Sequence, residues 1–303
     1  MTRAVRSIPT AADQELFDAF TTYQEGRGLS ACTLRRRRCC LGRFVGFMTP
    51  RSVTAAKGCD IDEWLARLSS AGTRKAYYSD LVAFFKWAHR RELIATNPMT
   101  LTDRPKNPKS LPKPARVETI AAAVAMSDGP VQLMILLGAL AGLRVSEIAA
   151  LSTDDIYVDN EPPVLVVRQG KGGKDRIVPI HPTLVDRLRH VRPGWLFPSE
   201  RPGLEHMQPG SVGLAVCAAL TAAGDGQHVT AHQLRHYFGT EASKWSNGNL
   251  VLVGGLMGHG SPATTAGYVA WNPTDGADVV SRIGGAGRLT VPDELAHRRR
   301  AAS

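Results

Sequence analysis

A run of prolines one third of the way along the chain restricts the fold more than any other feature. Residues 97–114 carry prolines at positions 98, 105, 108, 112 and 114. Proline fixes φ and lacks a backbone N–H, so this stretch is predicted to form neither regular helix nor sheet. Since 303 residues exceed what one small core usually organises, we expect two domains joined by an extended linker.

The part before the linker is predicted to be all helical. Apolar residues recur at helical spacing over residues 15–23, 33–48, 61–68 and 73–91, and no strand pattern appears there. In the last of these segments, the apolar stripe is expected to consist of Tyr77, Leu81, Phe84, Phe85 and Ala88.

The part after the linker mixes helices with a short sheet. Residues 117–126 and 130–151 have helical patterns, whereas residues 164–168 and 176–180 are typical of a β-hairpin. The predicted fold class is therefore mainly α with a small β-sheet: an all-helical N-terminal domain followed by a mixed, mostly helical C-terminal domain.

The charge of the chain indicates a polyanionic partner. Residues 1–110 hold 19 Lys and Arg against 10 Asp and Glu, whereas residues 111–303 hold 18 against 17. The basic excess thus belongs to the helical domain, which includes four consecutive arginines at 35–38. On a helix these side chains fan around the axis, and they serve either as a solvated surface or as contacts to backbone phosphates; the charge asymmetry favours the second.

Export and membrane insertion are not expected. The most apolar stretch, residues 131–143, contains Gly138 and Gly142 and is shorter than a membrane span. Asp13 and Glu15 lie where the apolar part of a signal peptide would be. The five cysteines fit no disulfide or metal spacing, so we expect a cytoplasmic protein with reduced, mostly buried thiols.

Two short motifs in the C-terminal part carry candidate cations. Arg144 follows a glycine that interrupts an apolar helix, and Glu147, three residues later, is placed to orient its guanidinium. Lys171 lies between glycines at the hairpin turn. A structural ion pair and a solvated turn lysine are the alternatives. A P-loop is excluded, because Lys174 is followed by Asp175 and a strand.

Two further motifs combine histidine with a helix start. Thr230 and Gln233 form a capping-box pattern, which puts His232 and Arg235 on one face of a helix start, where anions are attracted. A metal site using His232 and His236 is the weaker alternative, because no third ligand is evident.

His259 precedes a helix-start signal, Ser261-Pro262, and Tyr268 follows nine residues after His259. Taken alone, Tyr268 is typical of a buried structural side chain.

Together these motifs resemble the tyrosine recombinases, the lambda-integrase-like or Xer-like family, over nearly the whole chain. Residues 141–147 are similar to the first arginine box of the family, and residues 170–179 to its lysine hairpin. Residues 232–240 resemble the His-x-x-Arg box. Residues 256–259, with Thr264, Thr265 and Tyr268, look like the closing His–Tyr box. Residues 28–33, and Thr73-Arg74 leading to Asn97-Pro98, resemble the core-binding domain.

The resemblance implies DNA strand transfer through a 3′-phosphotyrosine on Tyr268, with no metal or other cofactor. Lys171 would act as general acid, His232 in proton handling, and Glu147 in positioning Arg144. The implied catalytic set is Arg144, Lys171, His232, Arg235, His259 and Tyr268. A phenol needs nearby positive charge to become a good nucleophile, which the two arginines and His259 would supply.

The resemblance also implies an architecture. Residues 1–101 would be a SAM-like core-site DNA-binding domain, 102–115 the linker, 116–284 a catalytic domain of the DNA breaking-rejoining type, and 285–303 a flexible tail. No arm-binding domain is expected. The candidate DNA contacts are Arg35, Arg36, Arg37, Arg38, Thr73, Arg74, Lys75 and Lys86.

The implied partners are double-stranded DNA core sites and further copies of the chain, forming a tetramer on DNA, in the nucleoid of a bacterial or phage-infected cell. Accessory proteins or a directionality factor are further candidates, and no membrane is involved. Residues 275–283 are expected to dock on a neighbouring protomer.

Two other functions use part of the same evidence. A type IB topoisomerase-like enzyme would need nearly the same catalytic residues, although the compact helical domain argues against it. A non-catalytic DNA-binding regulator would explain the basic domain but gives no reason for the ordered Arg-Lys-His-Arg-His-Tyr set.

Overall fold

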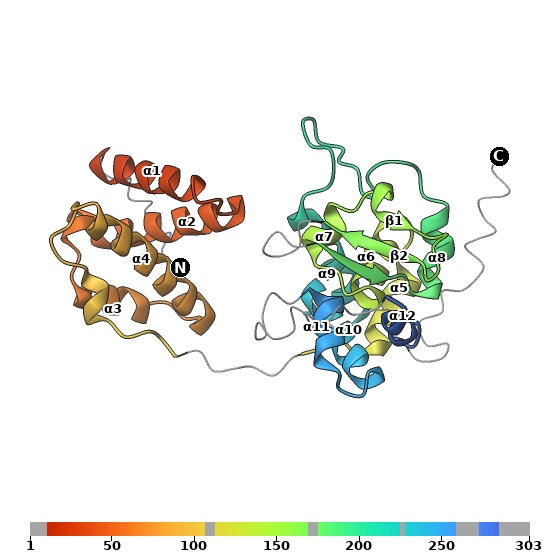
Figure 1. The fold of residues 1–303 in the computed structure, drawn as a ribbon. Coiled ribbons are helices and arrows are strands. Elements are labelled where there is room, and N and C mark those ends of the chain that lie inside the picture. Colours follow the sequence, from red (N-terminus) through yellow and green to blue (C-terminus); the bar gives the residue numbers. More distant parts are fainter. Residues whose placement is uncertain (1–10, 107–112, 169–174, 225–227, 259–272, 285–303) are drawn as a thin grey trace. The chain divides into compact units, whose positions relative to one another are not determined.

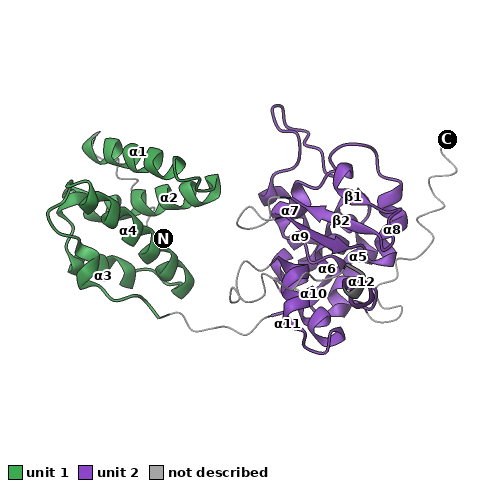
Figure 2. Cartoon of the chain, viewed as in Figure 1, with its two compact units in different colours: residues 1–110 green, residues 111–303 purple. Residues whose placement is uncertain are grey.

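The chain forms two compact units, residues 1–110 and residues 111–303 (Figure 2). The computed structural model describes residues 11–106, 113–168, 175–224, 228–258 and 273–284. These residues are mostly helical, with one small antiparallel sheet in unit 2 (Figure 1). The predicted fold class is therefore confirmed.

Unit 1 is helical throughout its described part. Its α-helices are α1 (Ala11–Glu25), α2 (Ala31–Met48), α3 (Gly58–Ala66) and α4 (Ala71–Arg90), and its 3-10 turns are η1 (Val53–Ala55) and η2 (Pro98–Leu101). Serines begin two of the helices, since the hydroxyls of Ser30 and Ser70 accept hydrogen bonds from backbone N–H groups of the first turn. All four predicted helices are confirmed, each longer at its start than the apolar spacing indicated.

The core of unit 1 is rich in aromatic rings. The predicted stripe on α4 is buried as expected. Phe44 of α2 lies at its centre, with its ring centroid 5.0 Å from that of Trp64 and 6.2 Å from that of Phe85. These edge-to-face contacts join α2, α3 and α4 around one apolar centre.

The prediction for the proline-rich stretch needs one correction. The 3-10 turn η2 lies within it, and both Pro98 and Met99 are buried. Proline is well suited to the first position of such a turn, where its missing N–H has no partner to lose. In the described part of the stretch, irregular backbone is therefore confined to residues 102–106 and 113–114 after Leu101 and residue 97 before it.

Unit 2 consists of a helical assembly and a three-stranded sheet. Its described helices are α5 (Val117–Met126), α6 (Gly129–Leu140), α7 (Val145–Ala149), η3 (Thr153–Asp155), α8 (Pro182–Arg189), α9 (Pro209–Ala223), α10 (Ala231–Trp245), α11 (Leu250–Met257) and α12 (Pro273–Ser281). The predicted helix over residues 117–126 is confirmed. The segment 130–151 forms two helices separated by a turn at Gly142, so the expected break of the apolar helix at this glycine is confirmed.

The predicted β-hairpin is confirmed. Strands β2 (Val164–Val167) and β3 (Arg176–Pro179) pair antiparallel, with Val167 opposite Arg176. A third strand, β1 (Ile156–Tyr157), pairs with β2 on its other side. It was not predicted, because two residues are too few to show an alternating pattern.

Helix α12 packs against its own chain. Val279, Val280 and Ile283 are buried in the core of unit 2, where α12 contacts β3 and α10. His181 Nε2 lies 3.0 Å from the carbonyl oxygen of Ile283 and anchors the end of this segment. The expectation that residues 275–283 dock on a neighbouring protomer is therefore wrong for this apolar face, because the chain itself covers it.

Two other expectations concern exposure. Of the five free cysteines only Cys40 is buried, so the prediction of mostly buried thiols is wrong. In the described ranges, no helix has both the length and the apolar character needed to span a bilayer.

Candidate active site

Arg144 is placed by the turn between α6 and α7. Gly142 adopts a φ of +62°, and a Cβ there would lie 2.4 Å from Cδ1 of Phe238, so glycine is required by both conformation and space. Arg144 then becomes the N-cap of α7. Its backbone N–H donates to Oε2 of Glu147 at 2.8 Å, and its Nη1 donates to Oε1 at 2.6 Å. Glu147 thus fixes both the start of α7 and the direction of the guanidinium.

Glu147 binds a second arginine, Arg176 of β3, which the sequence analysis did not single out. Arg176 Nη1 and Nη2 donate to the two carboxylate oxygens at 2.9 and 2.7 Å. A signal for it existed. Ile177 is exposed and Val178 is buried, so the two-residue period of the predicted strand turns Arg176 inward, where an arginine needs a carboxylate partner.

Arg235 is the most deeply buried cation of this region, with 2% of its surface exposed. It extends from α10, where its Nη1 donates to the carbonyl oxygen of Gly142 at 2.5 Å. Its Nη2 donates to the carbonyl oxygen of Met257. One guanidinium therefore ties the turn before Arg144 to the end of α11.

Three arginines meet at the C-terminal end of α11 and bind its last carbonyls. The pairs are Arg176 with Leu256, Arg235 with Met257, and Arg144 with Gly258. A helix C-terminus carries partial negative charge, so it attracts cations. Gly258 ends the helix in the left-handed conformation, φ +57°, and a Cβ there would contact the side chain of Arg176. Below, Arg144, Arg176, Arg235 and Glu147 together are called the arginine cluster.

The arginine cluster carries more positive than negative charge. Glu147 is the one carboxylate that its arginines contact in the described part of the chain. Burial raises the pKa of Glu147, but bonds from Arg176 and then Arg144 outweigh this effect and lower the pKa to about 2. Burial, followed by repulsion from Arg144, lowers the pKa of Arg235 to about 9. Both groups stay ionised at neutral pH, and the excess charge suits an anion such as a phosphodiester.

His232 lies at the start of α10, one helical turn before Arg235. The predicted capping box is present, since the backbone N–H of Thr230 donates to Oε1 of Gln233 at 2.7 Å. Partial burial, then His236, Arg235 and Arg144, lower the pKa of His232. The ring is therefore neutral at pH 7 and able to accept a proton. Its ring centroid is 4.5 Å from that of His236, but no cluster of three metal-ligating side chains occurs among the described residues.

The other three predicted catalytic residues, Lys171, His259 and Tyr268, lie outside the described residues. Lys171 belongs to the connection between β2 and β3, the strand that carries Arg176, and His259 directly follows Gly258.

Three of the four consecutive arginines of α2 bind carboxylates of neighbouring helices. Arg36 binds Asp80 of α4 through two bonds, at 2.7 and 3.0 Å, and Arg37 Nε lies 3.3 Å from the same carboxylate. Arg38 binds Asp18 of α1. Arg35, Arg36 and Arg38 remain exposed, so contact of these side chains with DNA stays a prediction.

The remaining candidate DNA contacts differ in surroundings. Arg35 and Lys86 are exposed, whereas Thr73, Arg74 and Lys75 are half-buried. The backbone N–H of Thr73 is bound by the N-cap of α4. Nε of Arg74 is buried and has no hydrogen-bond partner among the residues that the structure describes.

Comparison with known proteins agrees with this arrangement. The model of the phage integrase family matches residues 113–274. Tyrosine recombinase XerA of Pyrococcus horikoshii is 32% identical over 264 residues, which cover 84% of this chain and 89% of that protein. Tyrosine recombinase XerC of Chromobacterium violaceum is 30% identical over 272 residues, covering 84% and 90%. The chain therefore belongs to the phage integrase family.

Solved structures show the same fold. The integrase from mycobacterium phage Brujita has 31% sequence identity and a TM-score of 0.51, with 93% of this chain and 96% of that chain covered. A lambda integrase fragment bound to a core site has a TM-score of 0.65 at 20% identity, over 82% and 95% of the chains. Within its family the protein is a tyrosine recombinase, an enzyme of site-specific DNA recombination.

Proposed function

We propose that this recombinase cuts and rejoins DNA through Tyr268, at a phosphodiester held by Arg144 and Arg235. The observation that carries the proposal is the excess positive charge of the arginine cluster, which lies where α11 ends and the segment with His259 and Tyr268 begins. Each guanidinium keeps N–H groups beyond those bonded to the described residues, and these would bind the phosphate oxygens.

Cleavage is a transesterification at phosphorus. The phenolic oxygen of Tyr268 attacks, the bond to the 5′ oxygen breaks, and the DNA is left as a 3′-phosphotyrosine. Lys171 gives a proton to the departing 5′ oxygen, and the neutral ring of His232 receives the proton that leaves the phenol. Arg144, Arg235 and His259 stabilise the charge that develops on the phosphate oxygens. Glu147 and Arg176 hold Arg144 and the end of α11 in place.

Rejoining runs the same steps in reverse. A 5′-hydroxyl of the partner strand attacks the phosphotyrosine, and Tyr268 leaves with its proton returned. One phosphate ester replaces another at each step, so the reaction needs neither nucleotide hydrolysis nor a metal ion.

The substrate of this proposal is duplex DNA with two core sites, bound by four protomers. In support, solved structures with this fold include a lambda integrase tetramer bound to a Holliday junction. Residues 1–101 would bind the core site, residues 102–115 form the linker, and residues 116–284 carry the chemistry. Relatives from cellular Xer systems and from a phage support either integration of phage or mobile DNA, or Xer-like resolution. The reaction would take place in the cytoplasm, at the nucleoid.

Trapping of the covalent adduct tests the assignment. The protein is incubated with pooled genomic fragments and denatured in detergent, and sequencing of the attached DNA identifies the site. Arg235→Lys and Arg144→Lys should each lower the adduct yield by roughly 10²-fold, since a single ammonium cannot replace the bidentate fork. Arg189→Lys is the control, because Arg189 pairs with Asp159 on the surface of the same unit. Equal yields from all three variants would contradict the role of the cluster.

A further inference from the structure

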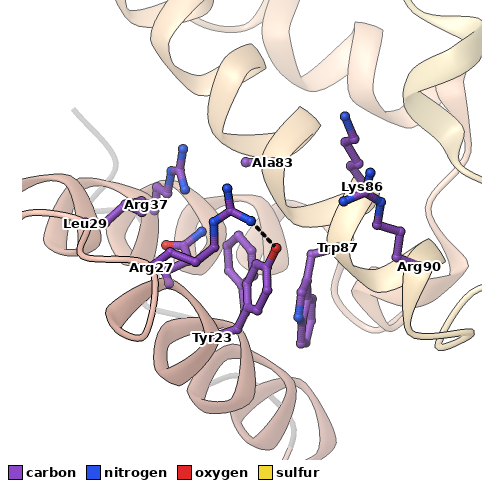
Figure 3. Close-up of a pocket in the computed structure, with 10 residues that line it drawn as sticks. Tyr23, Arg27, Leu29, Arg37, Ala83, Lys86, Trp87 and Arg90 are labelled. Carbon is purple, nitrogen blue, oxygen red and sulfur yellow. Dashed lines mark hydrogen bonds between the residues drawn. The ribbon is translucent and has the colours of Figure 1, made fainter.

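Unit 1 contains a pocket of about 260 Å³ that the recombination mechanism does not use. It lies where the end of α1, the connection to α2, and the last turns of α4 meet. Its lining is Phe20, Tyr23, Gln24, Arg27, Leu29, Arg37, Ala83, Lys86, Trp87 and Arg90 (Figure 3). This lining combines four cations and three aromatic rings with no carboxylate, a composition typical of sites for flat anions.

Two buried hydrogen-bond donors of this pocket lack a partner within the described residues. They are Nε2 of Gln24 and Nε1 of Trp87, and these two residues are only 3% and 6% exposed. Buried N–H groups are almost always paired, and leaving two of them unpaired is costly. Both residues line the same pocket, so a small rotation of either side chain would bring its unpaired N–H to an occupant with hydrogen-bond acceptors.

Two of the four cations, Arg27 and Arg37, are held at the rim by contacts within the protein. Arg27 Nη1 donates to the hydroxyl of Tyr23 at 3.1 Å, and its guanidinium carbon lies 5.6 Å from the centroid of that ring. Arg27 and Arg37 lie on one side of the aromatic pair, with Lys86 and Arg90 on the other (Figure 3). Arg37 has only the longer contact to Asp80, since Arg36 takes the two shorter ones. Positive charge therefore surrounds the opening.

The aromatic walls favour a flat ligand over a small inorganic anion. The rings of Tyr23 and Trp87 are 6.3 Å apart and inclined by 34°. A planar base stacks on such rings, and an amide such as that of Gln24 bonds the edge of a base through its N–H and C=O groups. The volume suits one nucleotide and is too small for a dinucleotide. Water would supply acceptors for the two donors but neither negative charge nor a flat surface.

We propose that this pocket binds one nucleoside phosphate, with its base against Tyr23, Gln24 and Trp87 and its phosphate at Lys86 and Arg90. The ligand is either a free nucleotide or a nucleotide of bound DNA, which share this chemistry. The proposal is independent of Tyr268 and of the arginine cluster, which belong to unit 2.

Calorimetry on the full-length protein tests the site. The four nucleoside 5′-monophosphates, adenosine and inorganic phosphate are titrated separately. At least one monophosphate should bind, and adenosine and phosphate should each bind about tenfold or more weakly, because each lacks half of the recognised groups. Absence of binding by all four monophosphates, or equal binding of inorganic phosphate, would overturn the proposal in favour of a hydrated pocket.

Matched variants locate the binding. Arg90→Gln and Lys86→Gln remove exposed cations from the rim, and each should weaken the monophosphate by about tenfold. Arg91→Gln removes the neighbouring exposed cation, which does not line the pocket, and should leave binding unchanged. Trp87→Phe keeps a ring but removes the unpaired N–H, and should weaken binding with little change of fold. Equal effects of Arg90→Gln and Arg91→Gln would show that general charge, and not the pocket, binds the nucleotide.

Competition separates the two sources of the ligand. If duplex DNA displaces the monophosphate, and Arg90→Gln weakens both, the pocket takes a nucleotide of the DNA. If DNA and monophosphate bind together, the pocket takes a free nucleotide. Tyr268→Phe should lose the covalent DNA adduct but still bind the monophosphate. Measuring both properties on this variant therefore separates failure of this proposal from failure of the catalytic assignment.

Discussion

Neutralising Glu147 gives the sharpest test of the arginine cluster, and Glu147→Gln is the suitable change because it preserves shape. The carboxylate is 9% exposed and accepts four hydrogen bonds, two from Arg176 and two from Arg144. The amide can accept on one oxygen only, and it leaves Arg176, with 7% of its side chain exposed, without a counter-charge. Loss of one partner of a buried pair costs about 3–5 kcal/mol.

The pH dependence of the free energy of unfolding gives an independent estimate of how much the Glu147 carboxylate stabilises the protein. The pKa of Glu147 falls from an ordinary 4.5 to about 2 in the folded protein. Because the folded pKa is the lower one, the stabilisation is fully present above pH 4.5 and is lost as pH falls toward 2. This shift corresponds to about 3 kcal/mol in the wild-type protein. Glu147→Gln lacks this carboxylate, so its stability should not show this loss between pH 4.5 and 2.

Urea unfolding of the full-length protein at several pH values, followed by circular dichroism, measures both effects. The variant should be less stable by about 3–5 kcal/mol at pH 7, and the difference from wild type should shrink as pH approaches 2. Glu200→Gln, at an exposed glutamate of the same unit, is the control. A loss no greater than that of the control, or one that does not vary with pH, would refute the reasoning.

Three further outcomes follow from the same structure. Gly142→Ala should destabilise unit 2 by about 1–3 kcal/mol in urea unfolding, because the added methyl group overlaps Phe238. Gly248→Ala is the control: Gly248 also has a positive φ but has open space around it, so this change should cost less. Equal losses of stability would mean that backbone strain alone matters. Ile283→Ala should cost about 2–4 kcal/mol and speed proteolytic removal of α12, since Ile283 is buried; an unchanged cleavage rate would show that α12 is held elsewhere. Thr230→Ala should cost about 1 kcal/mol through loss of the capping box at the start of α10, measured by thermal unfolding against Thr240→Ala; no difference between the two would contradict the role of the cap.

Much of the fold could be predicted because local patterns there agreed with the tertiary structure. The helical spacing of α4 matched a stripe that is buried, and the capping box at Thr230 formed as the residue types indicated. The hairpin was recognisable because β-branched residues flank a glycine-rich turn. Gly142 likewise marked the break between α6 and α7, whereas β1, with two residues, was too short to be recognised.

Several residues of the site could be predicted from the sequence, but the hydrogen bonds and ion pairs that join them across the fold could not. Arg144 and Glu147 are close in sequence, so their pairing follows from helix geometry. The bond between Glu147 and Arg176 joins residues 29 positions apart and depends on how β3 packs against α7. Similarly, the arginines of α2 were expected to face DNA, but Asp80 and Asp18 lie within reach only once α1, α2 and α4 have packed.

Identification of the amino acid that carries the DNA tests the central claim most directly. The trapped adduct is digested with nuclease and protease, and the nucleotide-bearing peptide is sequenced by mass spectrometry. We expect a phosphodiester on Tyr268, formed in chelator and without added nucleotide, and absent from Tyr268→Phe. A nucleotide attached to any other residue, or an adduct that survives in Tyr268→Phe, would contradict it.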